Sequence, residues 1–234
     1  MRRNTLTIAI GVLLALALVL AGCVTRTHSQ IETLKRPSAD LRILLMPLDV
    51  ELSELSAGGL KVLNAEWTQQ ALKHMAEAIR SETAGHGVRF VDRIEDASTD
   101  PRELQISALH GVVGQSILVH KFLPQGELPS KQGKFDWSLG PEVRRLRERY
   151  GADYALFVYM RDSYTSGGRV AVILIAALFG ASVQGGSQVG FASLVDLETG
   201  NVVWFNVVAR SEGDLRTPEP ARETVRHLID GLPK

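Results

Sequence analysis

Hydrophobic residues recur along the chain in runs and at helical spacing, and the order of these patterns predicts an α/β fold. The near-continuous apolar run Leu41–Val50 is typical of a strand buried on both faces, which Pro47 ends or bulges. Residues 64–83 repeat apolar side chains every four positions and predict a helix capped by Asn64. A short strand at Val88–Val91 and a helix starting at Asp100 follow. This alternation favours one domain with a mixed sheet flanked by helices.

The second half of the chain supplies the clearest strands. Two of them are joined by Leu197–Asn201, where Gly200 can adopt the left-handed conformation that closes a hairpin. Pro141–Tyr150 predicts a short basic helix, which is either a solvated face or an anionic docking patch. An amphipathic helix capped by Thr217 ends the pattern. The three predicted strands are Gly151–Met160, Val189–Asp196 and Val202–Ala209.

An apolar insertion, residues 168–187, separates the first two of these strands. Its centre, Val170–Val183, does not alternate in polarity and is flanked by Gly167-Gly168 and Gly185-Gly186. At roughly 14 residues it is too short to span a bilayer as one helix, which needs about 20. It is either a core helix or strand, or a surface that contacts a membrane or a hydrophobic partner. The candidate contact residues are Val170, Ile173, Leu174, Leu178 and Phe179.

The N-terminal pattern is that of a secretory signal. Arg2 and Arg3 precede the apolar run Leu6–Ala21, which ends in Leu20-Ala21-Gly22-Cys23. At about 16 apolar residues the run is shorter than the roughly 20 of a spanning helix. The ending resembles the lipobox of bacterial lipoproteins, which implies that Cys23 is lipidated, as with palmitate, and becomes the first mature residue.

The lipobox resemblance also implies a location and a division of the chain. In such lipoproteins an Asp after the cysteine marks inner-membrane retention, whereas this chain has Val24. We therefore expect an outer-membrane anchor facing the periplasm rather than the inner membrane. The polar stretch after the cysteine predicts a tether from the lipid to the domain. The expected division is a lipoprotein signal peptide (1–22), a lipidated tether (23–40) and an α/β periplasmic domain (41–234).

Composition restricts the chemistry that such a domain can perform. The 234 residues include 26 Lys and Arg against 26 Asp and Glu, a balance that gives no electrostatic footprint for nucleic acid. A single cysteine excludes an intramolecular disulfide and a thiolate metal cluster. With 45% hydrophobic residues, the mature domain must rely on its core.

Candidate catalytic groups are few. The six histidines are scattered without metal-ligand spacing, and no serine-hydrolase elbow is present in the sequence. Asp49, Glu51 and Glu54 could hold a cation or form an acid/base pair, but a solvated loop is the favoured interpretation. We therefore predict no catalytic residue, no metal, no cofactor and no small-molecule substrate.

Two segments resemble a known family. Gly151-Ala152-Asp153-Tyr154 opening a strand, and the later segment 194–204 (LVDLETGNVVW), are similar to envelope lipoproteins of the CsgG type. The penicillin-binding-protein activators and the TolB N-terminal domain share that fold. The resemblance implies an α/β domain with a mixed sheet and a non-catalytic role as adaptor, activator or secretion channel. Residues 169–188 depart from the family, whose inserted hairpins alternate apolar and polar residues.

The sequence thus favours a lipid-anchored envelope protein that acts through protein contacts or self-association. The alternative is an oligomeric membrane-inserting secretion component that uses residues 170–183. An envelope hydrolase is a third, less favoured hypothesis.

Overall fold

A computed structural model describes residues 23–29, 34, 41–84, 89–91, 100–123, 126–211 and 213–233. The predicted signal peptide, residues 1–22, lies outside the described residues, as does most of the predicted tether.

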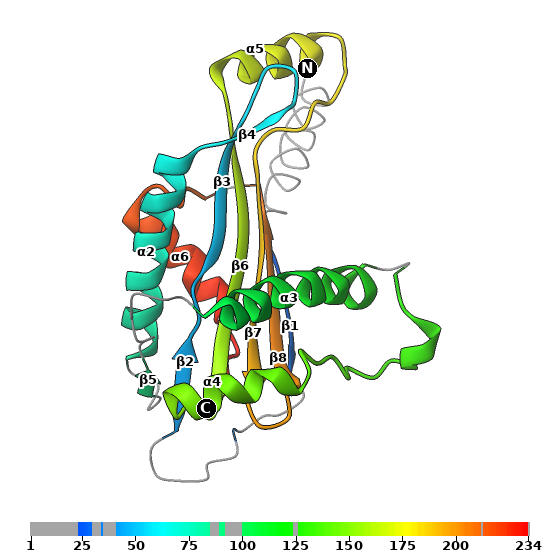
Figure 1. Ribbon diagram of the computed structural model, residues 1–234. Coiled ribbons are helices and arrows are strands. Elements are labelled where there is room, and N and C mark those ends of the chain that lie inside the picture. The colour runs from blue at the N-terminus through cyan, green and yellow to red at the C-terminus, as the bar shows by residue number, and fades with distance from the viewer. Residues whose placement is uncertain are drawn as a thin grey trace, which may run out of the picture.

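One mixed sheet of eight strands organises these residues, and five α-helices flank it, so the predicted fold class is confirmed (Figure 1). Along the main path the strand order is β1-β8-β7-β6-β2-β5, while β3 pairs with both β4 and β6. The central strand β6 is antiparallel to β7 and parallel to β2 and β3. The strands are β1 (Cys23–Ser29), β2 (Arg42–Leu45), β3 (Asp49–Leu55), β4 (Lys61–Leu63), β5 (Arg89–Val91), β6 (Tyr154–Thr165), β7 (Ser187–Asp196) and β8 (Val202–Arg210).

The first apolar run forms two short strands on one edge of β6. Its break falls around Pro47, as predicted, because proline cannot donate to the ladder. After the break, β3 continues beside β6 from the pair Asp49↔Tyr159 to the pair Leu55↔Thr165. The solvated loop favoured for Asp49, Glu51 and Glu54 is therefore wrong, because all three residues belong to β3.

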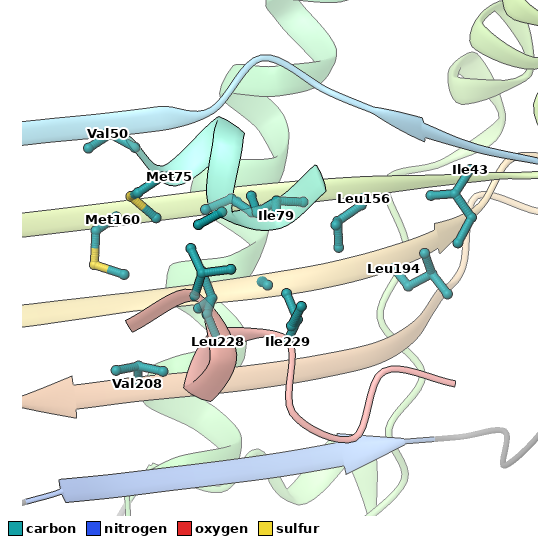
Figure 2. Close-up of a cluster of buried hydrophobic side chains, with 14 of the residues drawn as sticks. Ile43, Val50, Met75, Ile79, Leu156, Met160, Leu194, Val208, Leu228 and Ile229 are labelled. Carbon is teal, nitrogen blue, oxygen red and sulfur yellow. The ribbon is translucent and has the colours of Figure 1, made fainter. Parts of the chain in front are cut away.

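Helices cover both faces of the sheet and form two cores. On one face, α2 (Ala65–Thr83) and α6 (Pro218–Leu228) pack over β3, β6, β7 and β8 around the fully buried Met75 and Leu228 (Figure 2). On the other face, α3 (Pro101–Ile117) and α4 (Arg144–Tyr150) enclose a second cluster that contains Phe157, Phe191 and Phe205. Figure 1 shows the remaining helix, α5 (Gly167–Leu178), projecting from the end of the sheet instead of covering a face.

Several predicted helix and turn signals are confirmed. The Asn64 side chain accepts a 3.0 Å bond from the backbone N–H of Trp67, which begins α2. Gly200 has φ +79°, and the Asp196 carboxylate accepts bonds from the backbone N–H groups of Glu198 and Thr199. Thr217 occupies the cap position of α6, but its hydroxyl donates to the Asp214 carbonyl oxygen and accepts no bond from a backbone N–H of the helix.

The first residues of the predicted tether form a strand. Cys23–Ser29 forms β1, which pairs antiparallel with β8 from Cys23↔Arg210 to Ser29↔Trp204. The Thr27 hydroxyl donates to the Asn206 side-chain oxygen at 3.0 Å, and this bond fixes the strand to its neighbour. Residues 23–29 therefore lie at the edge of the sheet, where a strand needs a backbone partner on one side only.

Candidate functional site

Capping residues on either side of α5 explain why the apolar insertion forms a short helix with defined ends. The hydroxyl of Ser166 accepts a bond from the backbone N–H of Arg169, which caps the first turn. At the other end Gly180 takes φ +71°, and the N–H groups of Phe179, Gly180 and Ala181 donate to carbonyl oxygens of the last turn. Both ends of the helix therefore have backbone partners within the chain.

The side chains of α5 are exposed although almost all of them are apolar. None of the residues of α5 is buried, which rules out a core helix. Leu174 is 63% exposed and Leu178 and Phe179 are each 84% exposed. Of the five predicted contact residues, four are exposed, while Ile173 is half-buried and faces the returning loop near Gly185.

The hairpin formed by β3 and β4 lies beside α5 and extends the apolar surface (Figure 1). Arg169 joins the two: its guanidinium donates to the Ala57 carbonyl oxygen at 3.3 Å and to the Gln184 carbonyl oxygen at 3.0 Å. We call residues 56–63 and 166–180 together the apolar tip. Its exposed large apolar side chains are Leu60, Val62, Leu63, Val170, Val172, Leu174, Ile175, Leu178 and Phe179.

The hairpin half of the apolar tip was missed by the sequence analysis. Leu60, Val62 and Leu63 follow Gly58-Gly59, and no element was predicted between Val50 and residue 64. The short run of apolar residues next to a glycine pair was the available signal. It could not be assigned to a surface without knowing that β3 reaches so far along β6.

Length sets a limit on how the apolar tip can meet a bilayer. A 12-residue helix such as α5 is about 18 Å long, against a hydrocarbon core of about 30 Å. Within the described part of the chain, no helix has both the length and the apolarity needed to cross a membrane.

A buried polar network lies at the base of the apolar tip. The Asp162 carboxylate accepts bonds from the Tyr164 hydroxyl at 2.6 Å and from the Gln188 amide at 2.9 Å. The Gln188 oxygen in turn accepts a bond from Thr224 of α6. Burial raises the pKa of Asp162, and burial together with Asp162 raises the pKa of Tyr164. Because these groups satisfy one another, the network ties β6, β7 and α6 together.

A histidine and a serine lie as close together as in a catalytic pair, but they are not accessible. His110 Nε2 lies 2.7 Å from Ser193 Oγ, but both side chains are buried beneath α3. The imidazole stacks on Phe157 at 4.7 Å, and burial lowers its pKa to about 3. A substrate could not reach this serine without opening the core, so the pair belongs to the packing of the second cluster.

The three acidic residues considered as a cation site are strand residues. Asp49 and Glu51 lie on β3 and pair with Arg161 of β6 at 2.7 and 3.1 Å, and Glu54 lies further along the same strand. The carboxylates of Asp49 and Glu51 are therefore occupied by Arg161, which disfavours the cation and acid/base interpretations. Among the residues that the structure describes, no cluster of three or more His, Cys, Asp or Glu could hold a metal ion.

The basic helix α4 lies at the opposite end of the sheet from the apolar tip (Figure 1). It borders a cavity of about 390 Å³ whose charged side chains neutralise one another. Arg147 lies 3.5 Å from both Asp153 and Glu198, and Arg144 donates to the Glu198 carbonyl oxygen. These contacts favour the solvated-face interpretation over an anionic docking patch.

The predicted lipidation site, Cys23, is the first residue of β1. Its lipidation stays a prediction from the sequence.

Comparison with known proteins adds only distant likenesses. No family model and no curated protein matches the sequence. Among solved structures, the chain is similar to a PelC dodecamer from Paraburkholderia phytofirmans, with a TM-score of 0.42 and 12% identity over 90% of this chain and 99% of that chain. A single-residue variant of that PelC has a TM-score of 0.39 and 12% identity, over 90% of this chain and 97% of that chain. Likeness of this degree does not identify a function.

Proposed function

We propose that this chain is a lipid-anchored cell-envelope protein that acts non-catalytically, as a structural or assembly adaptor or activator of an envelope machine. The lipid is attached at Cys23, and the absence of Asp at position 24 favours the outer membrane, facing the periplasm. Its partners are the membrane and other envelope proteins or further copies of the chain.

The observation that carries this proposal is the exposure of α5. A soluble domain rarely exposes a contiguous apolar surface unless that surface meets a partner or a membrane. Here a capped helix without a buried residue lies beside an exposed hairpin, while the potentially reactive His110 and Ser193 are buried. The apolar tip is therefore available for contact with a partner or a membrane, whereas the histidine–serine pair is not accessible.

The alternative is an oligomeric secretion component that inserts residues 170–183 into the membrane. The exposure of α5 favours it as well, because apolar side chains are the ones that enter lipid. The helix is too short to cross the hydrocarbon region alone, so such insertion would be shallow or would need several copies.

Labelling with radioactive palmitate tests the anchor. We expect the full-length chain to incorporate the label and its mature form to begin at Cys23 by intact-mass analysis. Cys23→Ala should abolish the label, whereas Ser29→Ala, at the other end of β1, should retain it. Unlabelled wild-type protein would contradict the lipid-anchored function, and a specific hydrolytic activity of the purified protein would contradict the non-catalytic role.

A further inference from the structure

The strand register places the lipid-attachment residue at the same end of the sheet as the apolar tip. Cys23 pairs with Arg210, Arg210 pairs with Gln188, and Gln188 pairs with Asp162. Asp162 lies three residues before Thr165, the last residue of β6, after which the chain enters α5. At about 3.3 Å per residue, Cys23 therefore lies about 10 Å short of the base of the apolar tip along the strands.

The lateral separation is also small. Three strand spacings separate β1 from β6, which amounts to about 14 Å. Because Cys23 is itself a strand residue, no spacer lies between a lipid on Cys23 and the sheet. The acyl chains would hold the folded domain directly against the bilayer.

The apolar tip lies beyond Cys23 in the direction of that bilayer. Figure 1 shows α5 and the β3–β4 hairpin at the far end of the long strands, past the ends of β7 and β8. When the strands stand upright on the membrane, bringing Cys23 to the headgroups must bring the apolar tip among them. With Cys23 at the headgroups, the base of the apolar tip lies about 10 Å further along the strands, at the headgroup–acyl boundary that interfacial helices occupy.

We infer that the lipid surface holding the acyl chains of Cys23 also covers the apolar tip, with α5 lying in the plane of the headgroup–acyl boundary. This inference rests on the proposed function, since it needs the lipid on Cys23. It gives the domain a fixed orientation, with α4 and the β7–β8 turn directed away from the bilayer.

The chemistry of the apolar tip fits lipid. Its exposed large side chains are aliphatic or Phe179, and the charged Arg169 and Lys61 can reach phosphate groups or backbone carbonyls while their stems stay apolar. Both ends of α5 are capped within the chain, so entry into a dry environment leaves few backbone groups unsatisfied. The length of about 18 Å suits a helix that lies flat.

The far end of the molecule has the opposite character. Its exposed surface carries the arginines of α4 and the acidic Glu142 and Glu198, joined by ion pairs. Such a surface prefers water, so the two ends differ in the way expected of a protein that stands on a membrane.

Brominated-lipid quenching of an added tryptophan tests the inference. The lipidated full chain is reconstituted in phosphatidylethanolamine–phosphatidylglycerol vesicles with acyl-brominated or ordinary lipid, and the emission of the parent protein is subtracted. Phe179→Trp and Leu60→Trp report on the two halves of the apolar tip, whose native side chains are 84% and 73% exposed. Val112→Trp, on the outer face of α3, is the matched control because its native side chain is also apolar and 64% exposed.

We expect brominated lipid to reduce the added emission of Phe179→Trp and Leu60→Trp by about twofold, as for residues 5–10 Å deep, and to leave Val112→Trp unchanged. Vesicle flotation of the same samples distinguishes the failure of the lipid anchor from the failure of the contact between the apolar tip and the bilayer. Protein that fails to float would overturn the anchor itself. Protein that floats with both reporters unquenched would overturn the bilayer contact alone. Blue-shifted but unquenched emission would assign the apolar tip to a protein partner or a second copy.

Discussion

Arg169 donates from its guanidinium to the carbonyl oxygen of Ala57 at 3.3 Å, which joins the start of α5 to the turn of the β3–β4 hairpin. The same side chain donates twice to the Gln184 carbonyl oxygen, at 3.2 and 3.0 Å. One side chain therefore connects three segments of the chain: the start of α5, the turn of the β3–β4 hairpin and the loop that returns to β7.

Arg169→Met should loosen the apolar tip without unfolding the domain. Methionine keeps an apolar stem but loses all three donated bonds, while the two cores stay intact. We expect faster hydrogen exchange of α5 amides and a change in the global free energy of unfolding below about 1.5 kcal/mol. Arg145→Met, which removes an exposed bond to Glu142, is the control and should leave α5 exchange unchanged. Equal α5 exchange in wild type and Arg169→Met would disprove the connecting role.

Asn206→Ala should be strongly destabilising. The buried Asn206 amide donates to the carbonyl oxygens of His227 and Leu228 at the end of α6, at 2.7 and 3.0 Å, and its oxygen accepts from Thr27. Its loss leaves buried carbonyl groups unpaired, at a cost of about 2–4 kcal/mol in urea unfolding. Thr27→Val removes only the bond from β1 and should cost about 0.5–1.5 kcal/mol. Equal losses for the two variants would contradict the role of Asn206 at the end of α6.

Gly200→Ala should disrupt the β7–β8 turn. Gly200 has φ +79°, and an added Cβ would lie 2.2 Å from the Gly140 carbonyl oxygen, which is backbone and cannot swing away. We expect a cost of about 2–4 kcal/mol in urea unfolding. Gly133→Ala is the control, because φ is +76° there but the nearest atom is a flexible Glu127 oxygen at 3.8 Å. That control should cost about 1–2 kcal/mol, from the left-handed backbone alone.

Local signals explain which elements the sequence could predict. The helix α2 has a cap, Asn64, and an apolar stripe in which Ala71, Met75 and Ile79 are all buried. The strands β7 and β8 are apolar on both faces because helices cover both faces of the sheet. In each case the positions of the apolar residues indicate which side chains of the element are buried.

The missed elements depend on partners far away in the sequence. The sequence of β1 has no regular alternation of apolar and polar residues. It forms a strand because it pairs with β8. The carboxylates of Asp49 and Glu51 indicated a loop, but Arg161, more than a hundred residues later, neutralises both within a sheet. For α5, composition alone could not distinguish a core helix from an exposed one, because the exposure depends on how the rest of the described chain packs.

The buried histidine of the second core predicts how stability depends on pH. Burial lowers the pKa of His110 to about 3 in the folded protein, against 6.5 for an unperturbed histidine. The unfolded chain therefore takes up the proton first as the pH falls through 6.5. It follows that His110 contributes no pH dependence above about pH 7 and removes stability between about pH 6.5 and 3, with a slope of up to about 1.4 kcal/mol per pH unit.

Comparison with His110→Gln isolates this contribution. Glutamine can keep a hydrogen bond to Ser193 but does not titrate, and both proteins share the opposite contribution of Asp162, whose pKa burial raises. Urea unfolding of both proteins between pH 4 and 8 should give a constant stability difference above pH 7. Below pH 6.5 the wild type should lose stability faster than the variant. Parallel pH curves throughout would mean that the pKa of His110 is the same in the folded and the unfolded protein, contrary to its packing between Phe157 and Phe191.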